Sequence, residues 1–128
     1  MIKLDNKYVL HIPIHKYENK ELTSINIEKP IEELISKLND EGYTSFYKTK
    51  ITGYYKNRRF DEIIFTIFTE SDDDKVCMVF REWFNDNNST LKQESFAYEH
   101  NNSLIIETLW FNIIILLNSI YPFFDINY

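Results

Sequence analysis

Apolar and polar residues alternate over residues 7–15, where the sequence reads KYVLHIPIH. Every second residue of this run is apolar, so an extended chain presents one strongly apolar face, formed by Tyr8, Leu10, Ile12 and Ile14. The opposite face carries His11 and His15. The pattern predicts a β-strand over 7–15, and the polar residues 16–27 that follow it are expected to form a loop.

Two later segments have the spacing of amphipathic helices. In residues 28–42 the apolar positions recur at i, i+3, i+4 and i+7, and Gly42 is placed to end the helix in a left-handed conformation. Residues 71–87 form the second predicted helix, which begins with a run of aspartates and is broken by the sequence NDNNS. Its apolar stripe consists of Val76, Val79, Phe80, Trp83 and Phe84.

The remaining segments predict two β-hairpins. Residues 43–55 and 60–70 are rich in β-branched and aromatic residues, and the sequence KNRR between them contains the asparagine that tight turns favour. Residues 91–100 and 103–107 form the second pair, with a turn at 101–102. The order is therefore β-α-β-β-α-β plus one hairpin strand.

This order predicts an α+β protein with a ferredoxin-like βαββαβ arrangement, in which both helices cover one face of an antiparallel sheet. The length of 128 residues fits one domain, which we assign to residues 1–107. An apolar C-terminal extension, residues 108–128, follows. It is expected to pack on the domain or at a dimer interface.

The extension contains an uncharged run, LWFNIIILLNSIYPFF at 109–124. A membrane-spanning helix needs about 20 apolar residues. This run is shorter, is interrupted by Asn112 and Asn118, and has no flanking lysine or arginine. We therefore expect it to be buried against protein, as helix or as strand. The interface is predicted to include Ile64, Phe68, Leu109, Trp110, Phe111, Ile114, Leu117 and Tyr121.

Residues 8–100 resemble a family of small uncharacterised bacterial ferredoxin-like domains. The resemblance lies in Gly42, in Gly53 and in the sequence Gln93-Glu94-Ser95 at the start of the last core strand. The chain differs from that family in its apolar extension and in its N-terminus, which does not read as a secretion signal. The resemblance implies the fold and no reaction.

The net charge and the cysteine content indicate which ligands are disfavoured and in which compartment the protein is expected. The net charge of −6 disfavours binding to nucleic acid, which needs cationic surface. The chain has one cysteine, Cys77, so it forms no internal disulfide. Together with the N-terminal sequence, this predicts a cytoplasmic protein of bacterial or phage type, without a membrane segment.

Two groups of residues are candidates for ligand contacts. His11 and His15 are four residues apart, which on a strand separates them by about 13 Å and excludes a shared metal ion. Either one paired with Glu94 or His100 would form an acid–base pair. Residues 48–60 carry five cations among aromatic residues, so Tyr54, Tyr55, Arg58 and Arg59 are candidates for binding a phosphate or a nucleotide.

No catalytic or metal-binding motif stands out, and no cofactor is predicted. The leading hypothesis is therefore a non-enzymatic domain that acts through protein contacts, as a homodimer or as an inhibitor or regulator of a partner. The first alternative is a dimeric α/β-barrel-type enzyme or small-molecule binder, whose pocket is lined by histidine and tyrosine. The second is binding of a nucleotide or nucleic acid by the basic hairpin 48–60.

Overall fold

The computed structural model describes residues 1–70 and 74–108, within which the side chains of Tyr17, Glu18, Tyr55, Arg58 and Asp74 are not described. Its elements in order are β1 (Asn6–Pro13), β2 (His15–Glu18), β3 (Glu21–Ser24), α1 (Glu28–Asp40), β4 (Phe46–Tyr55), β5 (Arg58–Thr69), α2 (Asp74–Leu91), β6 (Ser95–His100) and β7 (Ser103–Thr108). Five strands form an antiparallel sheet in the order β4-β5-β1-β6-β7, and β2 and β3 form a separate hairpin.

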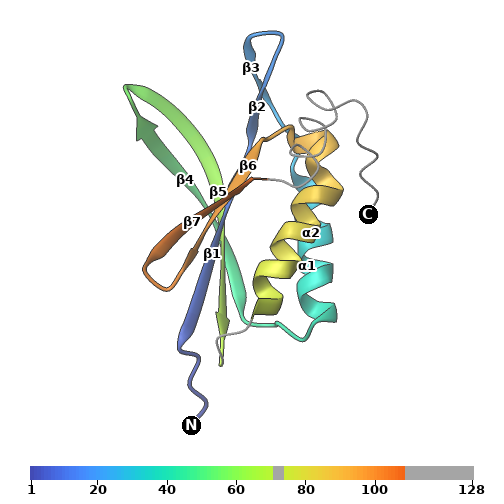
Figure 1. The fold of residues 1–128 in the computed structure, drawn as a ribbon, viewed down its shortest axis with the longest axis vertical. Helices are drawn as coiled ribbons and strands as arrows, with labels where there is room; N and C mark the ends of the chain where they lie inside the picture. Colours follow the sequence, from blue (N-terminus) through green and yellow to red (C-terminus); the bar gives the residue numbers. More distant parts are fainter. Residues whose placement is uncertain (71–73, 109–128) are drawn as a thin grey trace, which may run out of the picture.

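Both helices lie on one side of the five-stranded sheet, as Figure 1 shows. β1 connects through α1 to β4, and β5 lies between these two strands, which is the split βαβ arrangement. The predicted ferredoxin-like α+β fold and its extra hairpin strand are confirmed. The N-terminal alternation is also confirmed, because Tyr8, Leu10 and Ile12 are buried beneath the helices.

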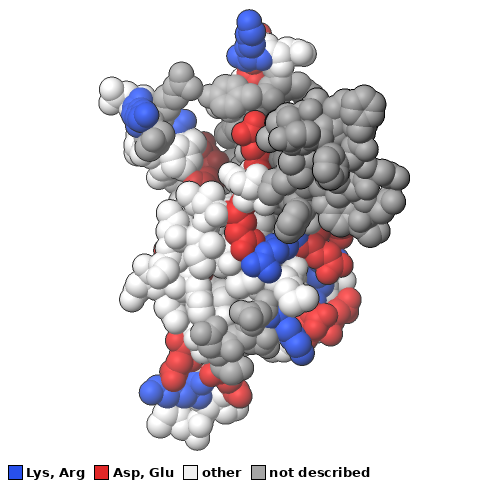
Figure 2. All heavy atoms as spheres, viewed as in Figure 1, with Lys and Arg blue, Asp and Glu red and all other residues white. Residues whose placement is uncertain are grey.

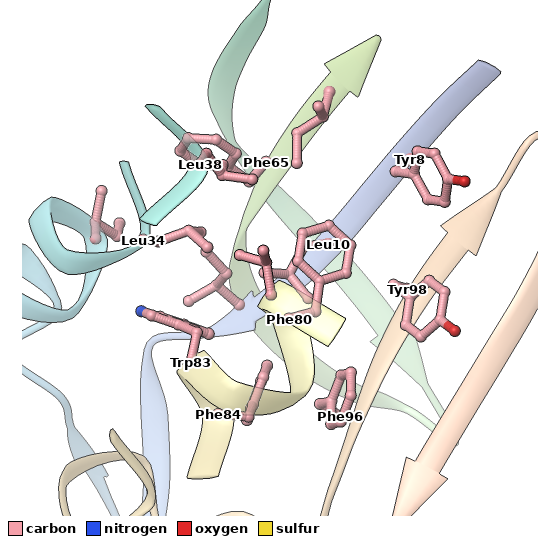
Figure 3. Close-up of a cluster of buried hydrophobic side chains, with 14 of the residues drawn as sticks. Tyr8, Leu10, Leu34, Leu38, Phe65, Phe80, Trp83, Phe84, Phe96 and Tyr98 are labelled. Atoms are coloured by element: carbon pink, nitrogen blue, oxygen red, sulfur yellow. The ribbon is translucent and has the colours of Figure 1, made fainter. Parts of the chain in front are cut away.

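The core between sheet and helices is rich in aromatic side chains (Figure 3). Trp83 is fully buried, and its indole N–H donates to the Pro30 carbonyl at 2.6 Å, which ties α2 to the first turn of α1. Phe84 packs against Phe96 of β6 with 4.6 Å between ring centroids. These contacts fix α2 relative to α1 and the sheet, and the candidate site is built at the C-terminal end of this helix.

Three local predictions need correction. β1 ends at Pro13 and His15 begins β2, so the two histidines do not share a strand. Residues 15–24 form a hairpin instead of a loop, with a two-residue turn at Asn19 and Lys20 whose φ angles are +53° and +66°. α2 continues to Leu91, because the side chain of Asn88 accepts a hydrogen bond from the Gln93 backbone beyond the helix end.

The opposite face of the sheet is not covered by the helices. By strand alternation it carries Ile64 and Phe68 of the predicted interface, both half-buried, and the exposed side chains of Leu104 and Ile106. The other predicted interface residues, Leu109, Trp110, Phe111, Ile114, Leu117 and Tyr121, lie outside the described residues. The homodimer and the role of the C-terminal extension therefore stay predictions.

None of the helices in the described part of the chain is long and apolar enough to cross a membrane.

Candidate functional site

A hollow of about 1100 Å³ lies at the end of the sheet where β1 finishes, between the β2–β3 hairpin and the β4–β5 hairpin. In Figure 1 these two hairpins are the projections at the top and the upper left of the molecule. The third wall is the segment that joins α2 to β6. The lining residues are Pro13, His15, Lys16, Leu22, Tyr54, Arg59, Phe60, Asp61, Glu62, Lys92, Gln93, Glu94 and Ser95.

The side chains that line the hollow are acidic, basic and aromatic, and the basic groups lie apart from the acidic ones. Carboxylates come from Asp61, Glu62 and Glu94, and aromatic rings come from Tyr54 and Phe60. In Figure 2 lysine and arginine atoms occupy the outer ends of both hairpins, with acidic atoms set back between them. The hollow therefore offers hydrogen-bond acceptors and negative charge next to surfaces on which a planar ring can stack.

Gln93 closes the hollow on the helix side. Its side-chain amide donates to the backbone carbonyls of His15 at 3.2 Å and of Leu91 at 2.8 Å. The bond to His15 ties the start of β2 to the segment that follows α2. Lys92, which lies between Leu91 and Gln93 in the chain, adopts a left-handed φ of +49°. The wall is thus held by the backbone geometry at the C-terminus of α2.

The β4–β5 wall is shaped by Gly53. A Cβ atom at this position would lie 2.3 Å from Cζ of Phe60, so only glycine allows the phenyl ring to lie across β4 as it does. On the other face of these strands, the Thr52 hydroxyl donates to the Asp61 carboxylate at 2.9 Å, and Arg59 lies 3.5 Å from it. The Thr52 hydrogen bond, with a smaller contribution from Arg59, lowers the pKa of Asp61.

A second, smaller hollow of about 200 Å³ adjoins the first and shares Pro13, Glu62, Gln93 and Ser95 with it. His11 lines this hollow. Its Nδ1 lies 3.2 Å from Oε2 of Glu62, and its Nε2 lies 2.8 Å from Oε2 of Glu99. The hydrogen bond to Glu62, followed by that to Glu99, raises the pKa of His11, although partial burial opposes the shift.

The structure brings together only part of the predicted site. His15, Tyr54, Arg59 and Glu94 all line the larger hollow, and His11 lies next to it. The side chains of Tyr55 and Arg58, which end β4 and begin β5, lie outside the described part of the chain. The predicted partners of the histidines need correction: His11 pairs with Glu62 and Glu99, and His100 stacks on Tyr8 on the helix side of the sheet.

Sequence reasoning missed Glu62, Glu99, Gln93 and Phe60. Glu62 and Asp61 are acidic residues at the start of a long apolar strand, and this was the signal available for them. Glu99 gave no such signal, because its contact with His11 depends on the register of β6 against β1. Among residues 1–70 and 74–108, no group of three or more histidine, cysteine, aspartate or glutamate side chains is arranged to hold a metal ion.

No protein-family model and no curated protein matches the chain. Two solved structures do match its fold. One is a phage SAM lyase in the apo state, with a TM-score of 0.53 and 12% identity over 82% of this chain and 90% of that one. The other is a phage SAM lyase in complex with S-methyl-5'-thioadenosine, with a TM-score of 0.54 and 13% identity over 86% and 97% of the two chains. The resemblance to a bacterial family that has a Gln-Glu-Ser sequence is not tested by these matches.

The leading hypothesis from the sequence, a non-enzymatic interaction domain, is contradicted by this finding. The solved structures that share the fold over most of both chains are those of an enzyme. The first alternative, an enzyme or small-molecule binder with a pocket lined by histidine and tyrosine, agrees better with them. At 12–13% identity the match itself establishes the fold alone.

Proposed function

We propose that this chain is an enzyme that binds S-adenosylmethionine (SAM) or a closely related adenosyl compound in the larger hollow, and cleaves it as a lyase. The observation that carries the proposal is the combination of three carboxylates and two aromatic rings around one hollow of about 1100 Å³. The fold shared with phage SAM lyase supports the choice of ligand.

The lining matches the parts of such a ligand one by one. Tyr54 and Phe60 lie on opposite faces of the β4–β5 hairpin, so either one, but not both together, offers a face for the adenine ring. Asp61, Glu62 and Glu94 can accept hydrogen bonds from ribose hydroxyls and attract the positive sulfonium and ammonium groups. Lys16 and Arg59 lie on opposite hairpins and suit the carboxylate of the amino-acid portion.

The reaction class follows from the sulfonium. When an oxygen of the substrate's own carboxylate bonds to the carbon that carries the sulfur, the bond from that carbon to sulfur breaks. The sulfur keeps the bonding electrons and leaves as a neutral thioether, S-methyl-5'-thioadenosine, and the amino-acid portion leaves as a lactone that keeps the positive ammonium group. A negative environment favours the cationic substrate over this neutral product, so the carboxylates serve recognition and the orientation of the breaking bond. Glu62 is the carboxylate that lines both hollows and is only 18% exposed. We assign it a hydrogen bond from a ribose hydroxyl beside the sulfur, a group that SAM and S-methyl-5'-thioadenosine share.

The experiment is an assay of SAM turnover. Purified protein is incubated with SAM, and S-methyl-5'-thioadenosine is quantified by liquid chromatography against a protein-free control. The wild type is expected to release the thioether faster than the spontaneous rate. Glu62→Gln should reduce the rate about a hundredfold, because the substrate is no longer held in the orientation in which its bond breaks. Glu82→Gln is the matched control, because Glu82 is an exposed residue of α2 that pairs with Lys37.

Two results would contradict the proposal in different ways. If the wild type binds S-methyl-5'-thioadenosine and does not turn over SAM, the hollow is a binding site and the lyase assignment is wrong. If it neither binds the thioether nor turns over SAM, the ligand assignment is wrong as well.

A cytoplasmic location, inferred from the sequence, is part of this proposal, because SAM is an intracellular metabolite. Nucleic-acid binding by residues 48–60 receives no support from a specific observation.

A further inference from the structure

His11 lies on the uncovered face of the sheet, clamped between carboxylates from both neighbouring strands. Its side chain is 22% exposed, and those of Glu62 and Glu99 are 18% and 39% exposed. β5 supplies Glu62 to Nδ1 at 3.2 Å, and β6 supplies Glu99 to Nε2 at 2.8 Å. Both ring nitrogens are therefore engaged by acidic groups.

The register of the strands explains this clamp. His11 is paired with Ile64 of β5 and with Ala97 of β6. Glu62 lies two residues before Ile64, and Glu99 lies two residues after Ala97, so both carboxylates are diagonal neighbours of His11 on the same face of the sheet. Glu62 is paired with Pro13 and lies towards the C-terminal end of β1, whereas Glu99 is paired with Val9 and lies towards its N-terminal end. The clamp therefore runs along β1 towards its C-terminal end, where the larger hollow begins.

The two contacts set the proton state of the imidazole. A neutral imidazole donates from only one nitrogen, whereas the imidazolium donates from both. Two ionised carboxylates therefore favour the imidazolium, and the pKa of His11 is raised. The other residues that flank it on this face carry no charge: they are Val9 and Pro13 on β1, Ile64 on β5 and Ala97 on β6. Beyond them, Thr49 of β4 and Ile106 of β7 are also uncharged.

We propose that His11 is a positioning residue for Glu62 in ligand binding. The imidazolium holds Oε2 of Glu62, which fixes the carboxylate plane and turns the other oxygen to a ligand in the larger hollow, which Glu62 also lines. Glu99 holds the imidazole from the other side and keeps it protonated. This inference rests on the proposed function, because it concerns the orientation of a carboxylate in the same hollow.

The test measures affinity for S-methyl-5'-thioadenosine by calorimetry between about pH 5.5 and 8.5, the range in which histidines titrate. In the wild type, affinity should be constant at low pH and fall as pH rises through the pKa of His11. That pKa is measured independently by following the imidazole resonances by NMR. In His11→Gln, affinity at low pH should be about tenfold weaker, the effect of losing one charged hydrogen bond, and the pH dependence should be absent.

Two further variants separate positioning from a structural role. Glu99→Gln removes one of the two carboxylates, so the decline of affinity should move to lower pH together with the pKa of His11. In a Glu62→Gln background, adding His11→Gln should produce no further loss of affinity, since His11 acts only through Glu62. The NMR spectra of all variants also report whether the fold is retained.

The outcomes distinguish this inference from the proposed function. If the wild type binds the thioether and His11→Gln binds it equally well with the same pH dependence, the positioning role is wrong and the proposed function stands. If the two substitutions add fully in the double variant, His11 does not act through Glu62, and the role is again wrong. If the wild type does not bind the thioether at any pH, the proposed function fails and the positioning role fails with it.

Discussion

Phe60 and Gly53 are a cross-strand pair in which one residue makes room for the other. The ring of Phe60 occupies the space that a Cβ of residue 53 would need, and this ring also lines the larger hollow. An aromatic ring that covers a glycine on the neighbouring strand is a known way to stabilise a sheet. The pair therefore links the backbone of β4 to the shape of the site.

Gly53→Ala is expected to turn the Phe60 ring out of its position. The unfolding free energy should fall by about 1 kcal/mol, as for other overpacked sites, and affinity for S-methyl-5'-thioadenosine should fall severalfold. Denaturant unfolding and calorimetry measure the two effects.

Gly42→Ala provides the matched control. Gly42 has a φ of +85°, and outside Gly42 and its two chain neighbours no atom lies within 4 Å of the place that a Cβ atom would occupy. Alanine should therefore cost about 1 kcal/mol through backbone strain alone. Its affinity for the thioether should equal that of the wild type. If Gly53→Ala also leaves affinity unchanged, Phe60 does not contact the ligand.

The clamp around His11 should also appear in the pH dependence of stability. Because the pKa of His11 is raised in the folded state, its two ion pairs stabilise the protein fully below the unfolded pKa of about 6.5. This stabilisation is lost as pH rises through the folded pKa. Wild type and His11→Gln should therefore differ most in unfolding free energy near pH 5.5 and converge above the folded pKa. A constant difference across this range would show that the clamp does not titrate.

At the residue scale, the sequence indicated His15 and Glu94 as a candidate acid–base pair, and it indicated Tyr54 and Arg59 as an aromatic ring and a cation suited to a phosphate or a nucleotide. All four residues line the larger hollow. It could not indicate that His11 contacts Glu62 and Glu99. The three residues are far apart in the chain, and a shift of one residue in strand register would place the carboxylates on the opposite face.

The β2–β3 hairpin is the element that distinguishes this chain from a plain βαββαβ domain. It stands apart from the five-stranded sheet and contributes His15, Lys16 and Leu22 to the hollow. At its base the Ile25 amide donates to the Ile14 carbonyl at 2.8 Å, so the chain leaves and re-enters the domain at neighbouring points. The hairpin can therefore be removed without stretching the fold.

Replacing residues 15–24 with Asn-Gly tests the contribution of this element. Asn-Gly closes a two-residue turn, which the distance between Ile14 and Ile25 permits. The variant should fold with far-ultraviolet circular dichroism like that of the wild type, and it should bind S-methyl-5'-thioadenosine at least about tenfold more weakly, since one wall of the hollow is missing.

Lys20→Gly is the control for the hairpin variant, because it keeps the element and gives its turn a residue suited to φ of +66°. It should bind as the wild type does. Full affinity in the hairpin deletion would exclude β2 and β3 from the site.

At the element scale, the strongly amphipathic segments were predicted well and the hairpin was not. α1 begins at Glu28 as expected, and its end is a glycine cap in which the amides of Gly42 and Tyr43 donate to the carbonyls of Asn39 and Leu38. The β2–β3 hairpin escaped prediction because its strands have four residues each and lack a fully buried face. The pattern of apolar residues reports only on elements that bury one side.

For the whole molecule, the charge distribution should matter for a cationic ligand. The net charge is −6, and three carboxylates line the hollow. SAM carries a net positive charge near neutral pH, whereas S-methyl-5'-thioadenosine is neutral. Raising the salt concentration from about 0.05 to 0.5 M should therefore increase KM for SAM severalfold and change the affinity for the thioether little. An equal salt effect on both would indicate that the carboxylates do not contact the sulfonium compound through charge.

The overall architecture was predictable because each helix and core strand has one apolar side, and only a few arrangements bury all of them. The hollow was not predictable, since its walls come from two hairpins and the end of α2, which meet only in the folded molecule. For the same reason, the absence of a catalytic motif in the sequence does not argue against the proposed activity. The carboxylates and rings of this site are distributed over separate segments of the chain.

The central claim is that an adenosyl compound binds between the β2–β3 and β4–β5 hairpins. The most direct test is to titrate S-methyl-5'-thioadenosine into isotopically labelled protein and to follow the backbone amide resonances by NMR. The account predicts saturable shifts concentrated in residues 14–16, 53–62 and 92–95, with α1 and the β6–β7 turn unaffected. Absence of saturable shifts, or shifts concentrated on the helices, would contradict it.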